Sequence, residues 1–361
     1  MLSELRRLAP EVRAFGMGGE EMRKAGAEIL TDFSEISVVG LSEVMKVLPR
    51  ARHIFGRLLS EAERRDAPAA VLIDFAEFNL RLAERLHERG MRVIYYISPQ
   101  IWAWRRGRVK TIARVVDEML VLFPFEVDFY RAHGVEVVNV GHPLVDEIAP
   151  RPQAWDAGSP DGPYRIALLP GSRPSEIEAL LPAMLAGVAR LAERLPIQVS
   201  LILAPTISRS LITDLEPALE LGALRVSVVA SERFDAIAAS HLALCASGTA
   251  TLEVGLLGTP MIVMYRLAKW TYRLARILVR VPHFSLVNLV LGRELVPELL
   301  QGQASPEAIA RRAEALLRDP QAIAEMRRGL TDLRGRLGAS GGSRRAALEV
   351  ARQLGLQEAP A

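Results

Sequence analysis

Short apolar runs of strand length alternate with helical patterns along most of this chain, and this alternation limits the folds open to it. The pattern is typical of parallel sheets with helices on their faces, which is an α/β architecture. The strands expected in the first half are residues 12–16, 70–74, 93–97, 118–122 and 136–140. Those expected in the second half are residues 164–169, 197–203, 224–229, 242–246 and 260–264. The sequence therefore predicts two doubly wound, Rossmann-like sheets.

A stretch rich in proline and glycine separates the two halves. Residues 149–163 have the composition of a linker, with Pro150, Pro152, Pro160, Pro163, Gly158 and Gly162. We expect one Rossmann-like domain at 1–148 and a second at 164–304, facing each other across a cleft. Residues 305–361 show only helical patterns and are expected to form C-terminal helices. A chain of 361 residues, 50% of them apolar, is long enough for two cores.

Composition also limits the compartment and the chemistry. Cys245 is the only cysteine and lies in a predicted buried strand, so no disulfide forms within the chain and a reducing compartment is expected. The first residues lack the apolar core of a secretory signal, and no stretch is apolar for long enough to span a bilayer. The six histidines are not spaced as metal ligands. We expect a cytoplasmic protein with no metal and no cofactor.

Two segments that combine glycine with a hydroxyl residue each follow a predicted strand and precede a helical pattern. They are Gly171-Ser172-Arg173, ahead of a helix expected at 175–195, and Ser247-Gly248-Thr249. Free backbone N–H groups and the positive end of a helix dipole bind anions at such junctions. Either segment alone is better explained as an ordinary turn and helix cap. Together, with an arginine in one of them, they favour a phosphorylated ligand.

One carboxylate in the first half occupies a similar place. Asp74 follows the apolar run at 70–73, at the carboxyl end of a predicted buried strand. That edge of a doubly wound sheet is where active sites lie, and a carboxylate there can act as a general base. Asp74 suits the capping of the next helix equally well. The residues alone leave both interpretations open.

Several segments, taken in order along the chain, carry a family resemblance. They are Gly16 to Gly19 with Met22, and residues 73–79, 96–105, 123–126, 141–143, 168–173, 246–253, 265–266 and 288–301. These segments resemble those of lipid-A-disaccharide synthases. The resemblance runs from Val12 to about Gln301 and implies the two-domain GT-B fold. It also implies an inverting transfer from UDP-2,3-diacylglucosamine to 2,3-diacylglucosamine 1-phosphate. The products of that reaction are a β-1,6-linked lipid A disaccharide and UDP.

The same resemblance implies roles for individual residues. Asp74 would be the catalytic base, and Arg173 would neutralise the departing diphosphate. The chain has no Asp-x-Asp pair to hold a metal on that diphosphate, so cations and helix N-termini must meet its charge. Glu253 is expected to accept hydrogen bonds from the ribose, although a first-turn acid also suits the helix dipole alone. The other expected substrate-binding residues are Gly171, Ser172, Ser247, Gly248, Thr249, Asn79, Ser98, Trp102, Asn288, Glu298 and Gln301.

Basic residues gather with apolar ones in three segments. One helix is predicted to carry a basic stripe with spacings of three and four, made of Arg266, Lys269, Arg273, Arg276 and Arg280. Residues 46–59 and 102–110 have similar mixtures. Each segment alone suits the solvated face of a core-packed helix, whereas three of them favour peripheral contact with the anionic inner membrane. Nothing resembles a nucleic-acid-binding module, and the family resemblance suggests a homodimer.

Two alternatives compete with the transferase. A UDP-N-acetylglucosamine 2-epimerase of related fold would share the UDP site, but the apolar, basic segments argue against it because it needs no acyl pocket. The other alternative is a non-catalytic remnant that binds a nucleotide sugar or a lipid. It stays open because residues 1–8 read as a helix where a doubly wound domain normally opens with a strand. We expect a strand and a Gly/Ser-rich loop to be encoded upstream of Met1, and unpaired sheet edges at 12–16 and 70–74.

Overall fold

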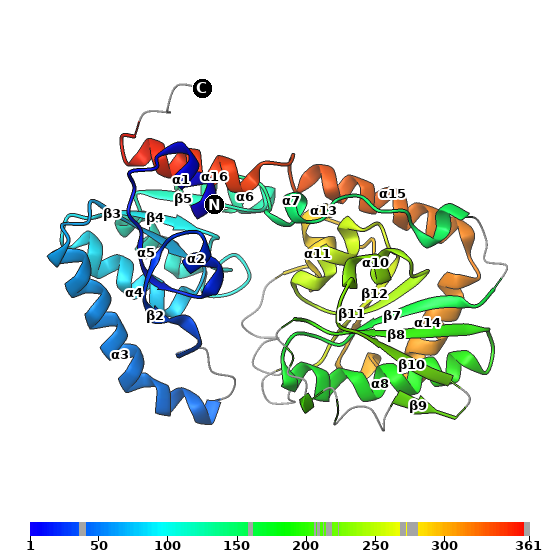
Figure 1. Ribbon diagram of the computed structural model, residues 1–361. Coiled ribbons are helices and arrows are strands. Elements are labelled where there is room, and N and C mark those ends of the chain that lie inside the picture. The colour runs from blue at the N-terminus through cyan, green and yellow to red at the C-terminus, as the bar shows by residue number, and fades with distance from the viewer. Residues whose placement is uncertain are drawn as a thin grey trace. The chain divides into compact units, whose positions relative to one another are not determined.

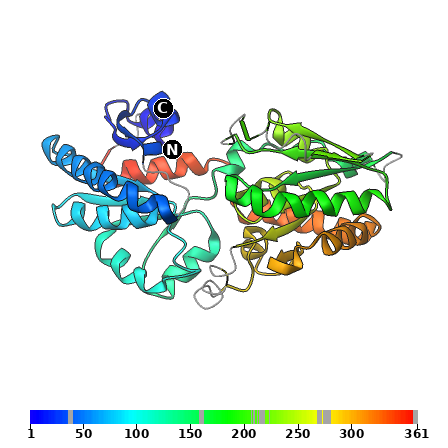
Figure 2. The same cartoon turned by 90° about the horizontal axis from the view of Figure 1, so that it is seen from below.

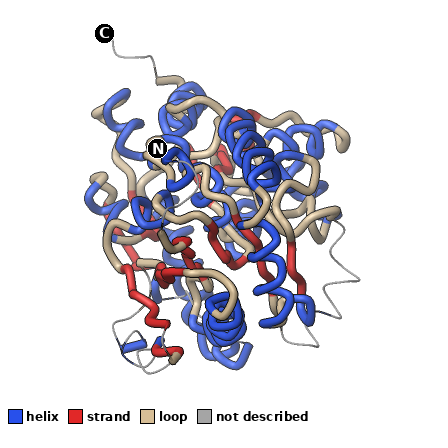
Figure 3. Tube along the Cα trace, turned by 90° about the vertical axis from the view of Figure 1, so that its right-hand side faces the viewer, coloured by secondary structure: helices blue, strands red, loops and turns tan. Residues whose placement is uncertain are grey.

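The computed structural model describes residues 1–35, 41–157, 162–205, 207, 210–211, 213, 219–222, 224–267, 272 and 281–356. The chain forms two compact units, one made of Met1–Pro143 with Ala339–Ala361 and the other of Leu144–Gly338. Both units contain helices and strands (Figure 3). The first unit includes the end of the chain, whereas the sequence led us to expect residues 305–361 to form one helical tail.

The second unit is built on a seven-stranded sheet, ordered β13-β12-β11-β7-β8-β10-β9. Its strands are β7 (Tyr164–Leu169), β8 (Ile197–Ile202), β9 (Glu220–Leu221), β10 (Leu224–Val229), β11 (Leu242–Ala246), β12 (Met261–Tyr265) and β13 (Glu298–Leu300). All neighbours pair in parallel except β9, which runs antiparallel to β10. Apart from β9, this is the strand order of a doubly wound nucleotide-binding sheet, which reverses its direction of growth between β7 and β11.

Helices cover both faces of this sheet (Figure 1). One face carries α8 (Pro174–Ala192) and α14 (Pro306–Leu317), and the other carries α10 (Arg233–Ala238), α11 (Thr249–Leu256) and α13 (Leu286–Leu291). The short α7 (Leu144–Glu147) and α15 (Pro320–Arg336) pack on α11. Every residue of β11 is buried, because a strand covered on two faces has no solvent side. This explains its continuous apolar run.

The first unit contains two separate parallel sheets. One is β3-β4-β5-β6 and the other is β1-β2. The strands are β1 (Phe15–Gly18), β2 (Glu28–Asp32), β3 (Ala69–Ile73), β4 (Arg92–Tyr96), β5 (Glu118–Val121) and β6 (Val138–Asn139). The expected strand at 12–16 begins at Phe15 instead, because Val12 N donates to Ala9 O at 3.1 Å in a turn after the first helix. In the order found, β1 and β3 each form a sheet edge.

The helices of the first unit come from both ends of the chain. They are α1 (Leu2–Leu8), α2 (Glu20–Lys24), α3 (Leu41–Arg64), α4 (Ala76–His87), α5 (Val109–Val115), α6 (Pro124–Arg131) and α16 (Gly342–Gln353). Helices α3 and α4 lie side by side (Figure 2), and α16 packs against α1. Arg345 Nε also donates to Val140 O at 2.9 Å, and Arg352 pairs with Glu118 at 2.8 Å. These contacts fasten the last helix to the first unit.

Candidate active site

The two segments expected to bind phosphate leave adjacent strands of the second unit. Leu169, at the end of β7, pairs in register with Cys245 of β11. Because the strands are parallel, residues 171–173 and 247–249 both lie at the carboxyl edge, at the point where the sheet reverses its direction of growth. Helices α8 and α11 begin at this edge, at Pro174 and Thr249. The N-termini of two helices thus supply positive dipole ends to one edge.

The loop after β7 is held by the carboxylate of Glu176, which was not among the expected site residues. Glu176 accepts from Ser172 N through Oε2 and from Arg173 Nη1 through Oε1, each at 3.0 Å. Gly171 has φ +126°, and a Cβ there would lie 2.5 Å from Glu176 Oε2, so only glycine allows this approach. Glu176 stands three residues after the N-cap Arg173, which is the capping-box position. That spacing was the signal available in the sequence.

The loop after β11 leaves its helix without a side-chain cap. Ser247 is fixed by two bonds of 2.8 Å, in which its N donates to Met264 O and its Oγ donates to Phe284 O. Gly248 is the N-cap of α11 with φ +146°, and no side chain caps this helix. Thr249 begins the helix and is exposed. An uncapped, accessible N-terminus of this kind suits an anionic ligand.

Glu253 lies one turn into α11 and has a partner from another element. Arg233 at the start of α10 donates to both of its carboxylate oxygens, at 2.7 and 3.1 Å. The glutamate side chain keeps 12% of its exposure and the arginine side chain 22%. Arg233 could not be inferred from the sequence, because twenty residues separate it from Glu253 and no motif links them. The role of Glu253 at the ribose stays a prediction.

Asn288, Glu298 and Gln301 make hydrogen bonds within the second unit. Asn288 is fully buried, donates to Val296 O and Glu298 Oε1, and accepts from the backbone N of Leu295 and Val296. Glu298 also accepts from the backbone N–H groups of residues 284 and 285. The amide of Gln301, in the orientation that satisfies it, pairs with both backbone groups of Leu267. These bonds fix the loops, and substrate contacts by these residues stay predictions.

The expected basic stripe falls largely outside the described residues, which include Arg266 but not Lys269, Arg273, Arg276 or Arg280. Arg266 is not part of a helix there. It follows β12 in a loop, and its guanidinium donates to Ala304 O at 2.7 Å, Ala179 O at 3.2 Å and Gln301 O at 3.4 Å. The expectation that Arg266 begins a helical stripe is therefore wrong, because this side chain binds backbone carbonyls of its own unit.

In the first unit, Asp74 follows β3 in an unusual backbone conformation. Asp74 and Phe75 have φ values of +47° and +45°, a region that non-glycine residues rarely enter. The carbonyl of Asp74 accepts from Tyr95 OH at 2.6 Å and from Asn79 Nδ2 at 2.9 Å, and Asn79 Nδ2 also donates to Ile73 O at 3.0 Å. These bonds hold the turn that presents the carboxylate, so Asn79 positions Asp74.

Asp74 as a whole residue is exposed, yet the protein atoms around its carboxylate change its acidity. Desolvation by the neighbouring protein atoms raises the pKa of Asp74, while a hydrogen bond from Phe75 N partly opposes the shift. A raised pKa strengthens a carboxylate as a proton acceptor. Strained backbone and a perturbed carboxyl commonly mark active sites. Both features support Asp74 as the base expected from the sequence.

The loop after β4 carries Ser98 and Trp102, and both are buried. Ser98 Oγ lies 2.8 Å from Tyr130 OH, and Trp102 Nε1 donates to Glu126 Oε1 at 3.2 Å. Glu126 Oε2 accepts from Leu122 N and Phe123 N at 3.1 and 3.0 Å. Burial raises the pKa of Glu126 to about 7, although these three N–H donors oppose the shift. Nothing in the sequence had pointed to Glu126 as the residue that holds this loop.

The aromatic and basic cluster at 102–110 is joined to the helix that follows Asp74. Arg105 and Arg108 both pair with Glu77 of α4, with Arg108 Nη2 at 2.6 Å from Oε1. Arg105 also lies over the ring of Trp104, 4.3 Å from its centroid. These cations are therefore engaged within the first unit, where they fasten the loop after β4 beside the turn at Asp74.

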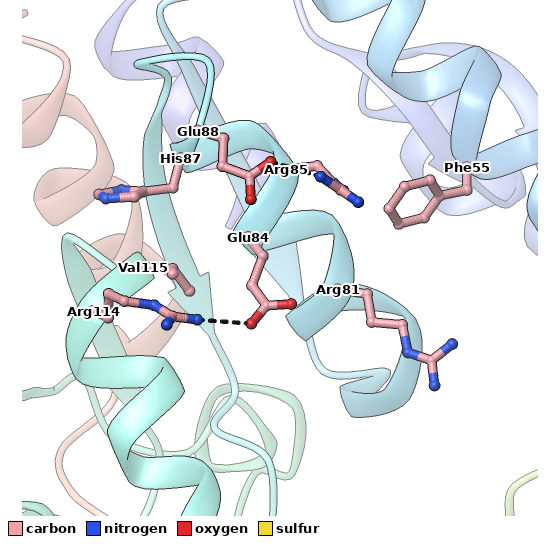
Figure 4. Close-up of a pocket in the computed structure, with 8 residues that line it drawn as sticks. All are labelled: Phe55, Arg81, Glu84, Arg85, His87, Glu88, Arg114 and Val115. Atoms are coloured by element: carbon pink, nitrogen blue, oxygen red, sulfur yellow. Dashed lines mark hydrogen bonds and ion pairs between the residues drawn. The ribbon is translucent and has the colours of Figure 1, made fainter.

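A cavity of about 730 Å³ opens elsewhere in the first unit (Figure 4). Its lining comes from α3, α4 and the end of α5, and comprises Phe55, Arg81, Glu84, Arg85, His87, Glu88, Arg114 and Val115. Glu84 pairs with Arg114 at 3.0 Å, and Arg85 with Glu88 at 2.8 Å. The lining residues of α4 begin at Arg81, in the middle of that helix, whereas Asp74 precedes its first residue. The cavity is therefore separate from the turn at Asp74.

The side chains of Cys245 and His142 are buried. Cys245 is fully buried, and burial raises the pKa of its thiol. His142 is 7% exposed, and burial lowers its pKa to about 4. Within the part of the chain that the structure describes, no three His, Cys, Asp or Glu side chains are grouped so that they could hold a metal ion.

Solved structures of two kinds share the fold. The glycotransferase of kitacinnamycin superposes with a TM-score of 0.63 at 20% identity, covering 98% of this chain and 95% of that one. A UDP-GlcNAc 2-epimerase from Neisseria meningitidis bound to UDP-GlcNAc gives a TM-score of 0.57 at 12% identity, covering 98% and 94%. At these identities the likeness establishes a common fold and does not distinguish a transferase from an epimerase.

Sequence relatives make that distinction. A family model described as lipid-A-disaccharide synthetase matches residues 1–347. The lipid-A-disaccharide synthase of Anaeromyxobacter dehalogenans is 46% identical over 354 residues, which cover 97% of this chain and 92% of that protein. The synthase of Myxococcus xanthus is 44% identical over 357 residues, with the same coverage. The chain therefore belongs to the lipid-A-disaccharide synthase family, and it is a glycosyltransferase of lipid A biosynthesis with the GT-B fold.

Proposed function

We propose that this enzyme transfers the sugar of UDP-2,3-diacylglucosamine to 2,3-diacylglucosamine 1-phosphate, forming a β-1,6-linked disaccharide and UDP. The observation that carries the proposal is the pair of loops at 171–173 and 247–249, which leave neighbouring strands at the reversal point of the second sheet. Two helix N-termini and the Arg173 guanidinium converge there. This arrangement suits the diphosphate of a nucleotide sugar.

The proposed chemistry assigns one step to each unit. Asp74 accepts the proton of the acceptor hydroxyl, whose oxygen then bonds to the anomeric carbon of the donor. The bond from that carbon to the β-phosphate oxygen breaks, and UDP leaves with the electron pair. Arg173 and the N–H groups at the start of α11 stabilise the negative charge that develops on the diphosphate. Attack opposite the leaving group inverts the anomeric configuration.

The direct test is to incubate the purified protein with both lipid substrates in detergent and to follow UDP release together with the disaccharide. We expect equal molar amounts of the two products, formed only when donor and acceptor are both present. UDP-N-acetylglucosamine alone is the control for the epimerase alternative. Isomerised sugar nucleotide from that control, or UDP without disaccharide, would contradict the proposed transfer.

The substrates carry acyl chains, so we also propose that the enzyme works at the surface of the inner membrane. No helix among the described residues has the length and hydropathy to span a bilayer. Attachment would then depend on the basic and apolar segments of the sequence, among them Lys269, Arg273, Arg276 and Arg280. A homodimer remains an expectation from the family resemblance.

This attachment should be sensitive to salt. Cosedimentation with anionic vesicles is expected at 0.1 M salt, where the screening length is about 10 Å, and should weaken as the salt concentration rises. A variant in which Lys269, Arg273 and Arg276 are replaced by glutamine should sediment less under the same conditions. Neutral vesicles serve as the control. Cosedimentation that does not depend on salt concentration or lipid charge would refute an electrostatic attachment.

A further inference from the structure

The predicted diphosphate site already contains an anion that belongs to the protein. The Ser172 N–H and the Arg173 guanidinium are donors that the loop after β7 can offer to a phosphate, and both donate to the carboxylate of Glu176 at 3.0 Å. The carboxylate thus bridges a backbone amide and a cation, as a phosphate oxygen pair would. Glu176 comes from the first turn of α8, so it also lies at the positive end of that helix dipole.

The backbone of the loop is shaped for this contact. Gly171 has φ +126°, and a Cβ at this position would lie 2.5 Å from Glu176 Oε2 and 2.6 Å from Glu176 Cβ. Any other residue would therefore push the carboxylate away from the loop. Tyr265, at the end of β12, is affected by the same charges. Burial raises its pKa, the charge of Glu176 raises it further, and the charge of Arg173 lowers it. The glutamate is one of the charges that a ligand at this edge would meet.

We infer that Glu176 is an internal counter-anion of the donor site, which the diphosphate of the nucleotide sugar must displace from Ser172 and Arg173. The inference rests on the proposed function, because it takes residues 171–173 as the diphosphate site. Carboxylate and diphosphate repel each other, so they do not share these two donors. The diphosphate carries more charge and also reaches the N-terminus of α11, and this favours it in the exchange.

This exchange has two consequences for binding. Displacing Glu176 costs free energy, so the enzyme binds UDP and the donor more weakly than the same site would without the carboxylate. After transfer, Glu176 returns to Ser172 and Arg173 and competes with UDP, which promotes release of this product. Glu176 touches no reacting atom in this scheme. Its role is to set the affinity of the site.

The test compares UDP binding and product inhibition in wild type, Glu176→Gln, Arg173→Ala and the double variant. Glutamine keeps the size and one acceptor oxygen but removes the charge. We expect Glu176→Gln to lower the Kd of UDP and its inhibition constant by about three- to tenfold. The gain should be smaller in the Arg173→Ala background, because Glu176 and the diphosphate then compete only for the Ser172 N–H and no longer for the cation. Glu178 is an exposed residue of the same helix, so the variant Glu178→Gln controls for the loss of one negative charge.

The outcomes separate this inference from the proposed function. Weaker UDP binding in Glu176→Gln would show that Glu176 orients Arg173, and unchanged binding would show that the contact is irrelevant to the ligand. If Glu176→Gln and Glu178→Gln changed UDP binding equally, the change would come from the loss of one negative charge on α8 and not from the contact of Glu176 with the loop. Each of these results overturns the inference while UDP binding still depends on Arg173. If wild type fails to bind UDP, or Arg173→Ala binds it equally well, the proposed diphosphate site itself is wrong.

Discussion

Replacing Asp74 with asparagine is expected to lower disaccharide formation by about 10²- to 10⁴-fold, the usual contribution of a general base, while UDP still binds. The substitution keeps the size of the side chain and removes its ability to accept a proton. UDP binds to the other unit in the proposed mechanism, so its affinity should change little. Product formation from both lipid substrates and calorimetry with UDP measure the two effects.

The local structure around residue 74 should be the same in Asp74→Asn as in wild type. Asp74 has φ +47°, and asparagine tolerates the left-handed region better than other non-glycine residues. The turn is held through the backbone carbonyl of Asp74, which Tyr95 and Asn79 bind, and asparagine retains that carbonyl. Its side-chain oxygen can also still accept from Phe75 N. We therefore expect the thermal unfolding midpoint to stay close to that of wild type.

Asp66 offers a matched control. It is exposed, follows α3 and has φ +49°, so Asp66→Asn makes the same chemical change in the same backbone conformation away from the expected base. Transfer by Asp66→Asn should equal that of wild type. Activity of Asp74→Asn close to the wild-type rate would eliminate Asp74 as the base and leave it as part of the turn.

The pH profile gives an independent test of the same role. Desolvation raises the pKa of Asp74 above its ordinary value of 3.8, and only the deprotonated carboxylate accepts a proton. The rate should therefore rise with pH as Asp74 ionises, and this rise should lie at higher pH than that of an ordinary aspartate. The rise should be missing from the residual activity of Asp74→Asn. An identical acid limb in the variant would assign that ionisation to another group.

The sequence predicted the long strands well and the short ones poorly. β7, β10 and β11 have the predicted bounds, because each is an apolar run bounded by turn residues or loops. β9 and β13 have two and three residues, too few for a recognisable pattern. β2 was also missed, since Ile29 and Leu30 are its only adjacent apolar residues. Pattern recognition needs several residues that share one environment, and short edge strands lack them.

The residues of the candidate site likewise fall into those that the sequence predicts and those that it does not. The positions of Asp74 and of the two loops expected to bind phosphate were predictable because each directly follows a strand, and the topology then brings the two loops together. Glu176, Arg233 and Glu126 were not singled out, because each acts through a partner that the fold provides. The pair Arg233 and Glu253 joins the starts of two helices in space, and nothing in either local sequence marks it. Strand ends can be inferred locally, whereas the partners of a charge depend on tertiary structure.

The second large effect is expected at Arg173. Arg173→Ala should lower the rate of transfer by about 10²- to 10³-fold, because a charge-assisted contact to the departing diphosphate is worth roughly 2 to 4 kcal/mol in the transition state. Stability should hardly change. The side chain is 65% exposed, and its ion pair with Glu176 joins residues three apart on the surface, so we expect the free energy of unfolding to fall by less than about 0.5 kcal/mol.

Two further variants decide whether that loss belongs to the site. Arg190→Ala removes another cation of α8, one that pairs with Glu307 at 2.7 Å and is 50% exposed, and it should transfer at the wild-type rate. Arg173→Lys keeps the charge but loses the planar fork that matches phosphate oxygens, so its rate should fall between those of wild type and the alanine variant. Near-normal transfer by Arg173→Ala would make Arg173 an ordinary surface cation and leave the diphosphate charge to the helix N-termini alone. A loss that appears equally in Arg190→Ala would instead reflect the net charge of α8, since only Arg173 lies beside the loop after β7.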